Sequence, residues 1–189
     1  MNRQGAPHCH ALLKEEVFMS ITDSIGSTQY LTYRLAEETY ALDIGKVREV
    51  LDFTTITRVP HTPDFMRGVI NLRGSVVPVV DLRVRFGMTR TEKTVDTCVI
   101  IMEVALDGAP TVIGALADSV QEVLDLESDH IEPPPKIGSR LRTEFITGIG
   151  KHGGRFIIIL DIDKLFSADE LTMVQAAGAE NGPALSCAA

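Results

Sequence analysis

The chain has 189 residues, of which 44% are hydrophobic and 23% are charged, and its formal net charge is −8. These proportions are typical of a globular protein and exclude a chain that is disordered, collagen-like or a coiled coil throughout. The acidic balance disfavours nucleic acid and anionic lipid as partners, because the overall field repels polyanions. The apolar runs fall far short of the roughly 20 residues that cross a bilayer. We therefore expect no membrane insertion, no secretion signal and a cytoplasmic location.

Positive charge is concentrated in one part of the chain. Residues 53–93 contain seven basic and three acidic side chains, a net charge of +4, which leaves −12 for the rest. A basic patch on an acidic protein fits a specific acidic partner surface. Arginines scattered over a solvated surface would give the same sum.

The N-terminal part predicts a tail followed by a hairpin. Residues 1–29 show neither a helical nor a strand period, so we expect a flexible tail there. Apolar side chains then alternate with polar ones over 30–35 and again over 40–44, around a Glu37-Glu38 turn, which predicts a β-hairpin. The apolar spacing of 44–51 fits one face of a short helix, and it also fits a strand.

An internal repeat organises most of the chain. Residues 47–52 (VREVLD) recur as 120–125 (VQEVLD), and six residues recur after 80 positions in the pattern F-x-x-G-x5-G-x6-D-[LI]-x3-F. They are Phe65, Gly68, Gly74, Asp81, Leu82 and Phe86, and then Phe145, Gly148, Gly154, Asp161, Ile162 and Phe166. We interpret the chain as a degenerate duplication.

Each copy predicts short strands punctuated by glycine and proline, which suggests small barrels or a sandwich. The apolar strands 75–82 and 155–162 each lead into an aspartate of the repeat, Asp81 or Asp161, that is expected to cap the following turn. Pro78 cannot donate to a strand ladder, so its position should be an edge or a bulge. A capping box at 167–170 predicts a C-terminal helix over 167–178, followed by a frayed tail, 179–189.

No catalytic, cofactor-binding or metal site is predicted. The five histidines have no Cys, Asp or Glu at a recognised nucleophile or metal spacing. Residues 148–153 match G-x-G-x-x-G, but a β-branched strand follows them where a dinucleotide site needs a helix, so we interpret these glycines as a hairpin turn.

Arg73 stands out among the turn residues. It lies in the sequence Asn-Leu-Arg-Gly at a predicted turn, and it could form an ion pair with Glu49 of the V-x-E segment. The repeat has Gly153 at the equivalent position, so folding of the turn does not require arginine. A structural ion pair and a contact with a partner are compatible roles.

Several of these segments together resemble the CheW family. The similarity covers about 30–170, and its most specific part is a G-V-x-N-L-R-G run followed by P-V-V-D-L-R. The matching segments are 46–50, 57–60, 62–65, 67–74, 78–83, 117–120, Pro133-Pro134 and 145–148. The chain departs from the family in its longer N-terminal segment and in Ser119, where many members carry glycine.

The resemblance implies an all-β fold of two tandem SH3-like five-stranded β-barrels, with short helices and a C-terminal α-helix. Combined with the repeat, it predicts a division of the chain into five parts. These are a flexible N-terminal tail (1–29), a first β-barrel lobe (30–93), a second β-barrel lobe (94–166), a C-terminal helix (167–178) and a flexible tail (179–189).

The resemblance also implies a non-catalytic adaptor that couples methyl-accepting chemoreceptors to the histidine kinase CheA in bacterial chemotaxis. The expected partners are the cytoplasmic hairpin tip of the receptor and the regulatory domain of CheA, which would recruit this cytoplasmic protein to membrane-associated receptor arrays. The alternative is a CheW-like regulatory module of another receptor-kinase pathway, such as pilus-based motility.

In the family, receptors bind at a groove between the barrels. The matching positions here are Val47, Gly68, Arg73 and Val99, and the kinase contact lies largely on the first barrel. We therefore expect these four residues to take part in receptor binding, with Glu49 as the ion-pair partner of Arg73.

Overall fold

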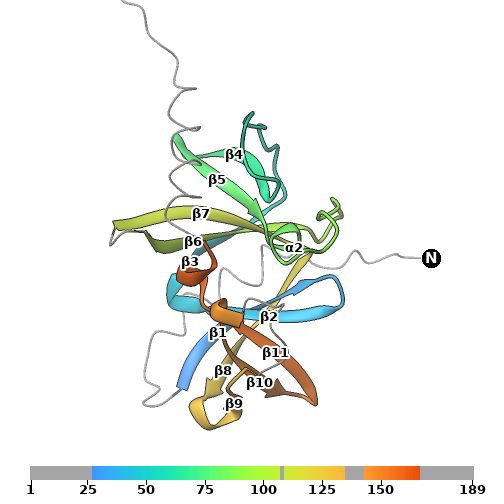
Figure 1. The fold of residues 1–189 in the computed structure, drawn as a ribbon, viewed down its shortest axis with the longest axis vertical. Helices are drawn as coiled ribbons and strands as arrows, with labels where there is room; N and C mark the ends of the chain where they lie inside the picture. The colour runs from blue at the N-terminus through green and yellow to red at the C-terminus, as the bar shows by residue number, and fades with distance from the viewer. Residues whose placement is uncertain (1–26, 107–108, 135–142, 167–189) are drawn as a thin grey trace, which may run out of the picture.

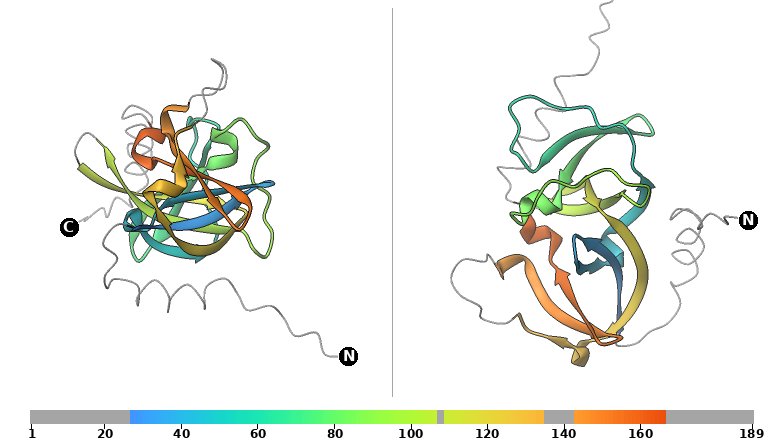
Figure 2. Two further views of the ribbon diagram at one scale, coloured as in Figure 1. Left: turned by 90° about the horizontal axis from the view of Figure 1, so that it is seen from below. Right: turned by 90° about the vertical axis from the view of Figure 1, so that its right-hand side faces the viewer.

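The computed structural model describes residues 27–106, 109–134 and 143–166. They form two β-sheets, each curled into a barrel, with single-turn helices near the junction between the sheets (Figures 1 and 2). The predicted all-β class with short helices is confirmed.

One sheet is built from both ends of the described chain and is called here the terminal sheet. Its strand order is β8-β1-β2-β11-β10-β9. The bounds are β1 (Ser27–Leu35), β2 (Glu38–Asp43), β8 (Ser119–Glu127), β9 (Ile131–Glu132), β10 (Ile146–His152) and β11 (Arg155–Leu160). It has six strands where five were expected, because the two-residue β9 is counted.

The other sheet, called the middle sheet, has the order β3-β6-β7-β5-β4. The bounds are β3 (Val47–Asp52), β4 (Met66–Leu72), β5 (Ser75–Asp81), β6 (Cys98–Leu106) and β7 (Ala109–Ala117). The helices are α2 (Leu82–Arg85), α3 (Ile162–Leu165) and the 3-10 turns Ile44–Lys46, Ser128–His130 and Thr143–Phe145.

The chain crosses between the sheets twice, and the two repeats exchange their first hairpins. In the terminal sheet β1 pairs with β8, and β2 runs parallel to β11. In the middle sheet β6 pairs with β3, and β7 runs parallel to β5. Each repeat therefore gives its first hairpin to one sheet and its remaining strands to the other.

The predicted lobes 30–93 and 94–166 follow the sequence repeats, and they do not coincide with the two sheets. Hairpins of similar apolar pattern can take each other's place between the remaining strands of either repeat, as in domain swapping. Local sequence specifies that a hairpin forms, but it does not specify which neighbouring strand the hairpin joins.

A shared apolar core holds the sheets together. It takes Leu42 from the terminal sheet and Ile100 from the middle sheet, both fully buried. Each sheet has a second cluster on its other face, to which Ile159 and Ile101 belong respectively. Adjacent Ile100 and Ile101 enter different clusters because successive strand residues point to opposite faces.

The phenylalanines of the repeat pair across the two copies. The ring centroids of Phe65 and Phe166 are 6.1 Å apart, and those of Phe86 and Phe145 are 5.2 Å apart. Since Phe65 and Phe86 are equivalent to Phe145 and Phe166, the two contacts are related by a pseudo-twofold axis. Both distances lie in the range of favourable aromatic pairs. This pairing explains why the framework keeps both phenylalanines.

Both crossings are held by an ion pair to a short helix of the opposite repeat. Lys46, just before β3, donates to Asp163 of α3 at 2.7 Å. Asp118, just before β8, accepts from Arg83 of α2 at 3.1 Å. The two links occupy similar places with their charges reversed.

The predicted N-terminal hairpin is confirmed by the β1–β2 pairing, which aligns Tyr33 with Tyr40. β1 begins at Ser27, so the last three residues of the predicted 1–29 tail belong to a strand, and 1–26 lie outside the described residues. The segment 44–51 is a 3-10 turn followed by a strand, which combines the two alternatives. The helix predicted over 167–178 and the tail 179–189 lie outside the described residues.

Pro78 lies on an internal strand but at a locally unpaired edge. It faces Val69 of β4, and the pairing of β5 with β7 starts only at Val79. The missing N–H of Pro78 therefore costs no ladder hydrogen bond on the β7 side, as the edge prediction required.

Candidate partner-binding site

The β4–β5 turn presents Arg73 to solvent, and its hairpin lies at the end of the molecule opposite the β10–β11 hairpin (Figure 1). Asn71 Oδ1 closes the turn by accepting from the Gly74 N–H at 2.8 Å. The Arg73 side chain is 80% exposed, and its Nη2 donates to Glu49 Oε2 at 2.9 Å. The ion pair expected from the sequence is present.

The backbone of Arg73 is unusual for a residue with a side chain. Its φ is 51°, in the left-handed region, and Gly153 in the β10–β11 turn has a φ of 56°. A non-glycine residue pays roughly 1 kcal/mol or more for this conformation. The interpretation of 148–153 as a hairpin turn is correct only at its end, because Gly148 and Gly150 lie in β10 and the turn is formed by Gly153 and Gly154. This turn forms without arginine.

Glu49 and Arg73 join the two edges of the middle sheet. Glu49 lies on β3 and Arg73 follows β4, and these strands stand at opposite ends of the sheet order. Thr57, between β3 and β4, also pairs with Val69 of β4. These contacts close the sheet into a barrel. An exposed ion pair adds only about 0–1 kcal/mol, so its contribution to stability is small.

Gly68 is buried on β4 and has a φ of 138°. A Cβ at this position would overlap the carbonyl oxygen of Thr57. Gly68 thus allows the β3–β4 connection to lie directly against β4. The equivalent Gly148 allows the same approach, because a Cβ there would lie 2.9 Å from the Glu132 carbonyl oxygen.

The two valines of the predicted site differ in exposure. Val47 opens β3, is half-buried and packs against the shared core. Val99 lies on β6 with no exposed area, within the second cluster, on the face of the middle sheet turned away from the shared core. Of the four predicted receptor-binding residues, only Val47 and Arg73 offer side-chain surface, and Gly68 and Val99 can act only by shaping the sheet.

The two repeated aspartates have diverged. Asp81 is fully buried and caps α2 by accepting from the N–H groups of Arg83 and Val84, as predicted. It also accepts from both the N–H and the Oγ1 of Thr91, at 3.0 and 2.9 Å. Asp161 makes no side-chain cap hydrogen bond and instead forms an ion pair with Lys164 at 2.7 Å, so the capping prediction is wrong for this residue.

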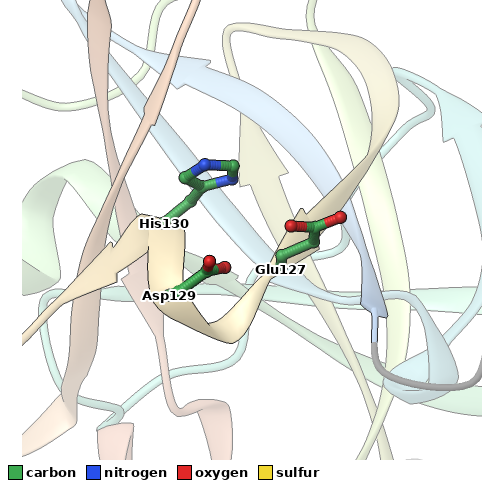
Figure 3. Close-up of side chains that lie close together, drawn as sticks. All are labelled: Glu127, Asp129 and His130. Carbon is green, nitrogen blue, oxygen red and sulfur yellow. The ribbon is translucent and has the colours of Figure 1, made fainter.

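Three potential metal ligands that the sequence analysis missed lie together at the end of β8 and in the 3-10 turn that follows it. Carboxylate oxygens of Glu127 and Asp129 and a ring nitrogen of His130 lie within 4.8 Å of one another (Figure 3). The signal was their clustering within four positions. All three are exposed, and a divalent ion there would keep several waters.

Among the described residues, no helix combines the length and the apolar character that crossing a bilayer demands.

Comparison with known proteins adds a consistent set of relatives. The family model of the CheW-like domain matches residues 29–170. The chemotaxis protein CheW of Klebsiella aerogenes is 40% identical over 146 residues, which cover 77% of this chain and 86% of that protein. CheW of Treponema pallidum is 28% identical over 164 residues, covering 87% and 95% respectively.

A solved structure agrees with these relatives. The crystal structure of the scaffolding protein TtCheW from Thermoanaerobacter tengcongensis superposes with a TM-score of 0.67 at 39% identity. The match covers 76% of this chain and 95% of that chain.

Proposed function

The chain belongs to the CheW family of chemotaxis adaptors, and on that premise we propose that it joins the cytoplasmic hairpin tip of chemoreceptors to the regulatory domain of the kinase CheA. The protein works without a catalytic step of its own, in the cytoplasm and at receptor arrays. The receptor meets the surface around Arg73, Glu49 and Val47, and the kinase meets part of the region 30–93.

The conformation of Arg73 is the observation that carries this proposal. The side chain is 80% exposed, its backbone is left-handed, and its ion pair is too exposed to offset much of that cost. The equivalent turn folds with Gly153. An arginine kept at a disfavoured and dispensable position is best explained by a contact outside the chain.

The coupling itself is a matter of linkage. An adaptor bound to receptor and kinase together transmits a change of receptor state only by as much as the two states differ in interaction free energy, typically about 1–3 kcal/mol. Gly68 and Val99 contribute by fixing the sheet behind the contact surface. Substitutions at these buried positions would act on binding through the shape of the barrel.

A reconstitution tests the proposal. Receptor tip fragments, CheA and the full chain are mixed in all combinations, and kinase activity is measured. We expect receptor-dependent activation only with all three components. Two-component mixtures that respond fully to the receptor would contradict the proposal.

Variants of the turn sharpen the test. Arg73→Ala and Arg73→Gly should weaken receptor binding by about tenfold or more, as loss of a charge-assisted contact predicts. Binding of the isolated CheA regulatory domain should change little. Arg155→Ala is the matched control, because Arg155 is an exposed arginine beside the opposite turn. Equal losses with this control would point to a nonspecific charge effect.

A further inference from the structure

A second positively charged feature lies at the end of β4 opposite Arg73. The connection between β3 and β4 forms one wall of a cavity of about 380 Å³. The residues that line the cavity include three arginines (Arg58, Arg67 and Arg90), one acidic residue, Asp64, and His61. Cationic side chains therefore outnumber anionic ones in the lining.

The three arginines are not neutralised equally. Arg67 is 19% exposed and donates to Asp81 Oδ2 and to the Thr91 carbonyl oxygen, both at 3.3 Å. Arg90 is exposed and donates to the backbone carbonyl of Asp64. Within the described part of the chain, neither Arg58 nor Arg90 forms an ion pair with a carboxylate. Asp81 thus orients Arg67 while two cations stay available.

The loop that carries Arg58 is preorganised by hydrogen bonds within the chain. Thr57 exchanges two backbone hydrogen bonds with Val69, at 2.9 and 2.8 Å. Thr62 Oγ1 donates to the Val59 carbonyl oxygen at 2.9 Å, and His61 has a left-handed φ of 59°. Prolines 60 and 63 stiffen the same loop. Preorganisation of this kind lowers the entropy cost of binding.

The fold does not require these arginines. Thr57 pairs with Val69, and in the second repeat Glu132 pairs with Ile149, which lies 80 positions after Val69. Thr57 therefore corresponds to Glu132, and Arg58 corresponds to Pro133. Thr147 stands in place of Arg67. The second hairpin forms with the same register shift and without either cation. Arg67 pairs with the buried Asp81 and has an internal role, whereas the charges of Arg58 and Arg90 have no such carboxylate partner and serve something other than folding.

We propose that this cavity, the basic pocket, binds acidic side chains presented by an extended segment of a partner protein. Guanidinium groups pair with carboxylates through two parallel hydrogen bonds. The volume admits more than a single ion.

One feature favours a carboxylate over a phosphate group. The prolines of the loop lack the N–H donors with which a backbone cradle binds phosphate. The basic pocket is separate from the Arg73 surface, and this inference stands whether or not Arg73 binds receptors.

NMR titration of the full chain tests the inference, observing the arginine side-chain Nε–H signals. The probes are the blocked peptides AEEAEEA and AQQAQQA and inorganic phosphate. We expect the glutamate peptide to shift the signals of Arg58, Arg67 and Arg90, with weaker binding at high salt. The double variant Arg58→Gln, Arg90→Gln should bind it about tenfold more weakly, because two charge-assisted contacts are lost.

Arg155→Gln is the control and should bind like the unchanged chain. Thermal unfolding of the double variant should be unaltered, because both side chains are exposed and no ion pair to a carboxylate is lost. Equal shifts with the glutamine peptide, or shifts spread over Arg155 as well, would overturn the inference. Displacement of the glutamate peptide by phosphate at equal concentration would overturn the choice of a carboxylate ligand.

Discussion

The β4–β5 and β10–β11 hairpins have the same backbone but different surfaces. In both hairpins the register of strand pairing shifts just before the first glycine of the repeat, between Met66 and Gly68 and between Ile146 and Gly148. In both, the aspartate N–H donates to the carbonyl oxygen of the first phenylalanine, at 2.7 Å in one and 2.8 Å in the other. A helix of one turn follows each.

The differences concern charged side chains. Arg67, Arg73 and Arg85 in the first repeat correspond to Thr147, Gly153 and Leu165 in the second. The second hairpin folds without arginine at any of these positions. The repeated glycines, aspartates and phenylalanines therefore specify the hairpin, and the arginines have roles that only the first copy requires. Arg85 is used internally, over the rings of Phe65 and Phe166 at 4.9 and 5.7 Å. Arg67 lines the basic pocket and donates to the buried Asp81, and Arg73 faces outward.

Substitution of the shared glycines should have the largest effect. Gly68→Ala places a Cβ against the Thr57 carbonyl oxygen at a positive φ, and we expect a loss of about 3 kcal/mol or more in the free energy of unfolding. Gly148→Ala should cost less, because Gly148 has no positive φ and a Cβ there would lie 2.9 Å from the nearest backbone oxygen, compared with 2.0 Å at Gly68. Urea unfolding measures both.

Gly153→Ala is the control for these variants, since a Cβ there meets nothing within 4 Å. It should cost about 1 kcal/mol, from the left-handed backbone alone. If Gly68→Ala were no more costly than this control, the close approach of the two segments would not matter for stability.

The next largest effect on stability should come from substitution of the two repeated aspartates, and it should differ between them. Asp81→Asn replaces a buried carboxylate that accepts from several donors, and we expect a cost of about 2–3 kcal/mol because some donors lose their acceptor. Asp161→Asn removes a pair whose lysine is 64% exposed and should cost less than about 1 kcal/mol. Similar costs in urea unfolding would show that the two hairpins have not diverged at this position.

The Arg73 turn should matter little for stability. Arg73→Ala keeps the strained conformation and loses the ion pair, so its cost should stay below about 2 kcal/mol. Arg73→Gly reproduces the second turn and relieves the strain, so it should be at least as stable as Arg73→Ala. Thermal unfolding compares the two. An aggregated Arg73→Gly protein would favour a structural role for this arginine.

The smallest effect concerns pH and the crossing at Lys46. Burial opposes ionisation of Asp163, but hydrogen bonds from Lys46 and from the Ala105 N–H outweigh it and lower the pKa of Asp163 below its ordinary 3.8. A lowered pKa gives stability that is complete above the unfolded value and is lost as pH falls through the folded value.

Asp163→Asn should therefore be less stable than the unchanged chain at about pH 6, by less than about 1 kcal/mol because the pair is partly exposed. The difference should shrink as pH falls below the ordinary pKa of 3.8 and through the lowered folded value. Urea midpoints across this range measure it, with Lys46→Gln as the second member of the pair. A difference that does not depend on pH would mean that Asp163 acts through packing.

Much of the fold was predictable because local sequence patterns specify the hairpins. The hairpin at 30–44 follows from alternation, and the two framework hairpins follow from glycine and aspartate spacing. The exchange of hairpins between the sheets was not predictable. It depends on short parallel pairings between strands that are not neighbours in the sequence, such as that of Ile158 with Tyr40, more than a hundred positions apart.

The candidate site was predictable in part for similar reasons. The pair of Arg73 and Glu49 followed from one charge at a turn and one on a strand. Val99 is buried because both faces of β6 are covered, one by the shared core and the other by the second cluster of the middle sheet, and a matched motif does not specify this. From the sequence, the basic pocket was visible only as an excess of positive charge over residues 53–93. Arg58 and Arg90 line the same pocket because of how the loops between them fold, which the sequence does not show.

The exchange of hairpins also determines the order in which the two sheets can fold. All five strands of the middle sheet lie between residues 47 and 117, so this sheet can close while the rest of the chain is still emerging from the ribosome. β1 must wait for β8, and Thr32 finds its acceptor, the Glu122 carbonyl oxygen, 90 positions later. Contacts of such separation form slowly. Pulsed hydrogen exchange during refolding should protect β6 and β7 before β1 and β2, so the earliest strands to be synthesised are among the last to be secured.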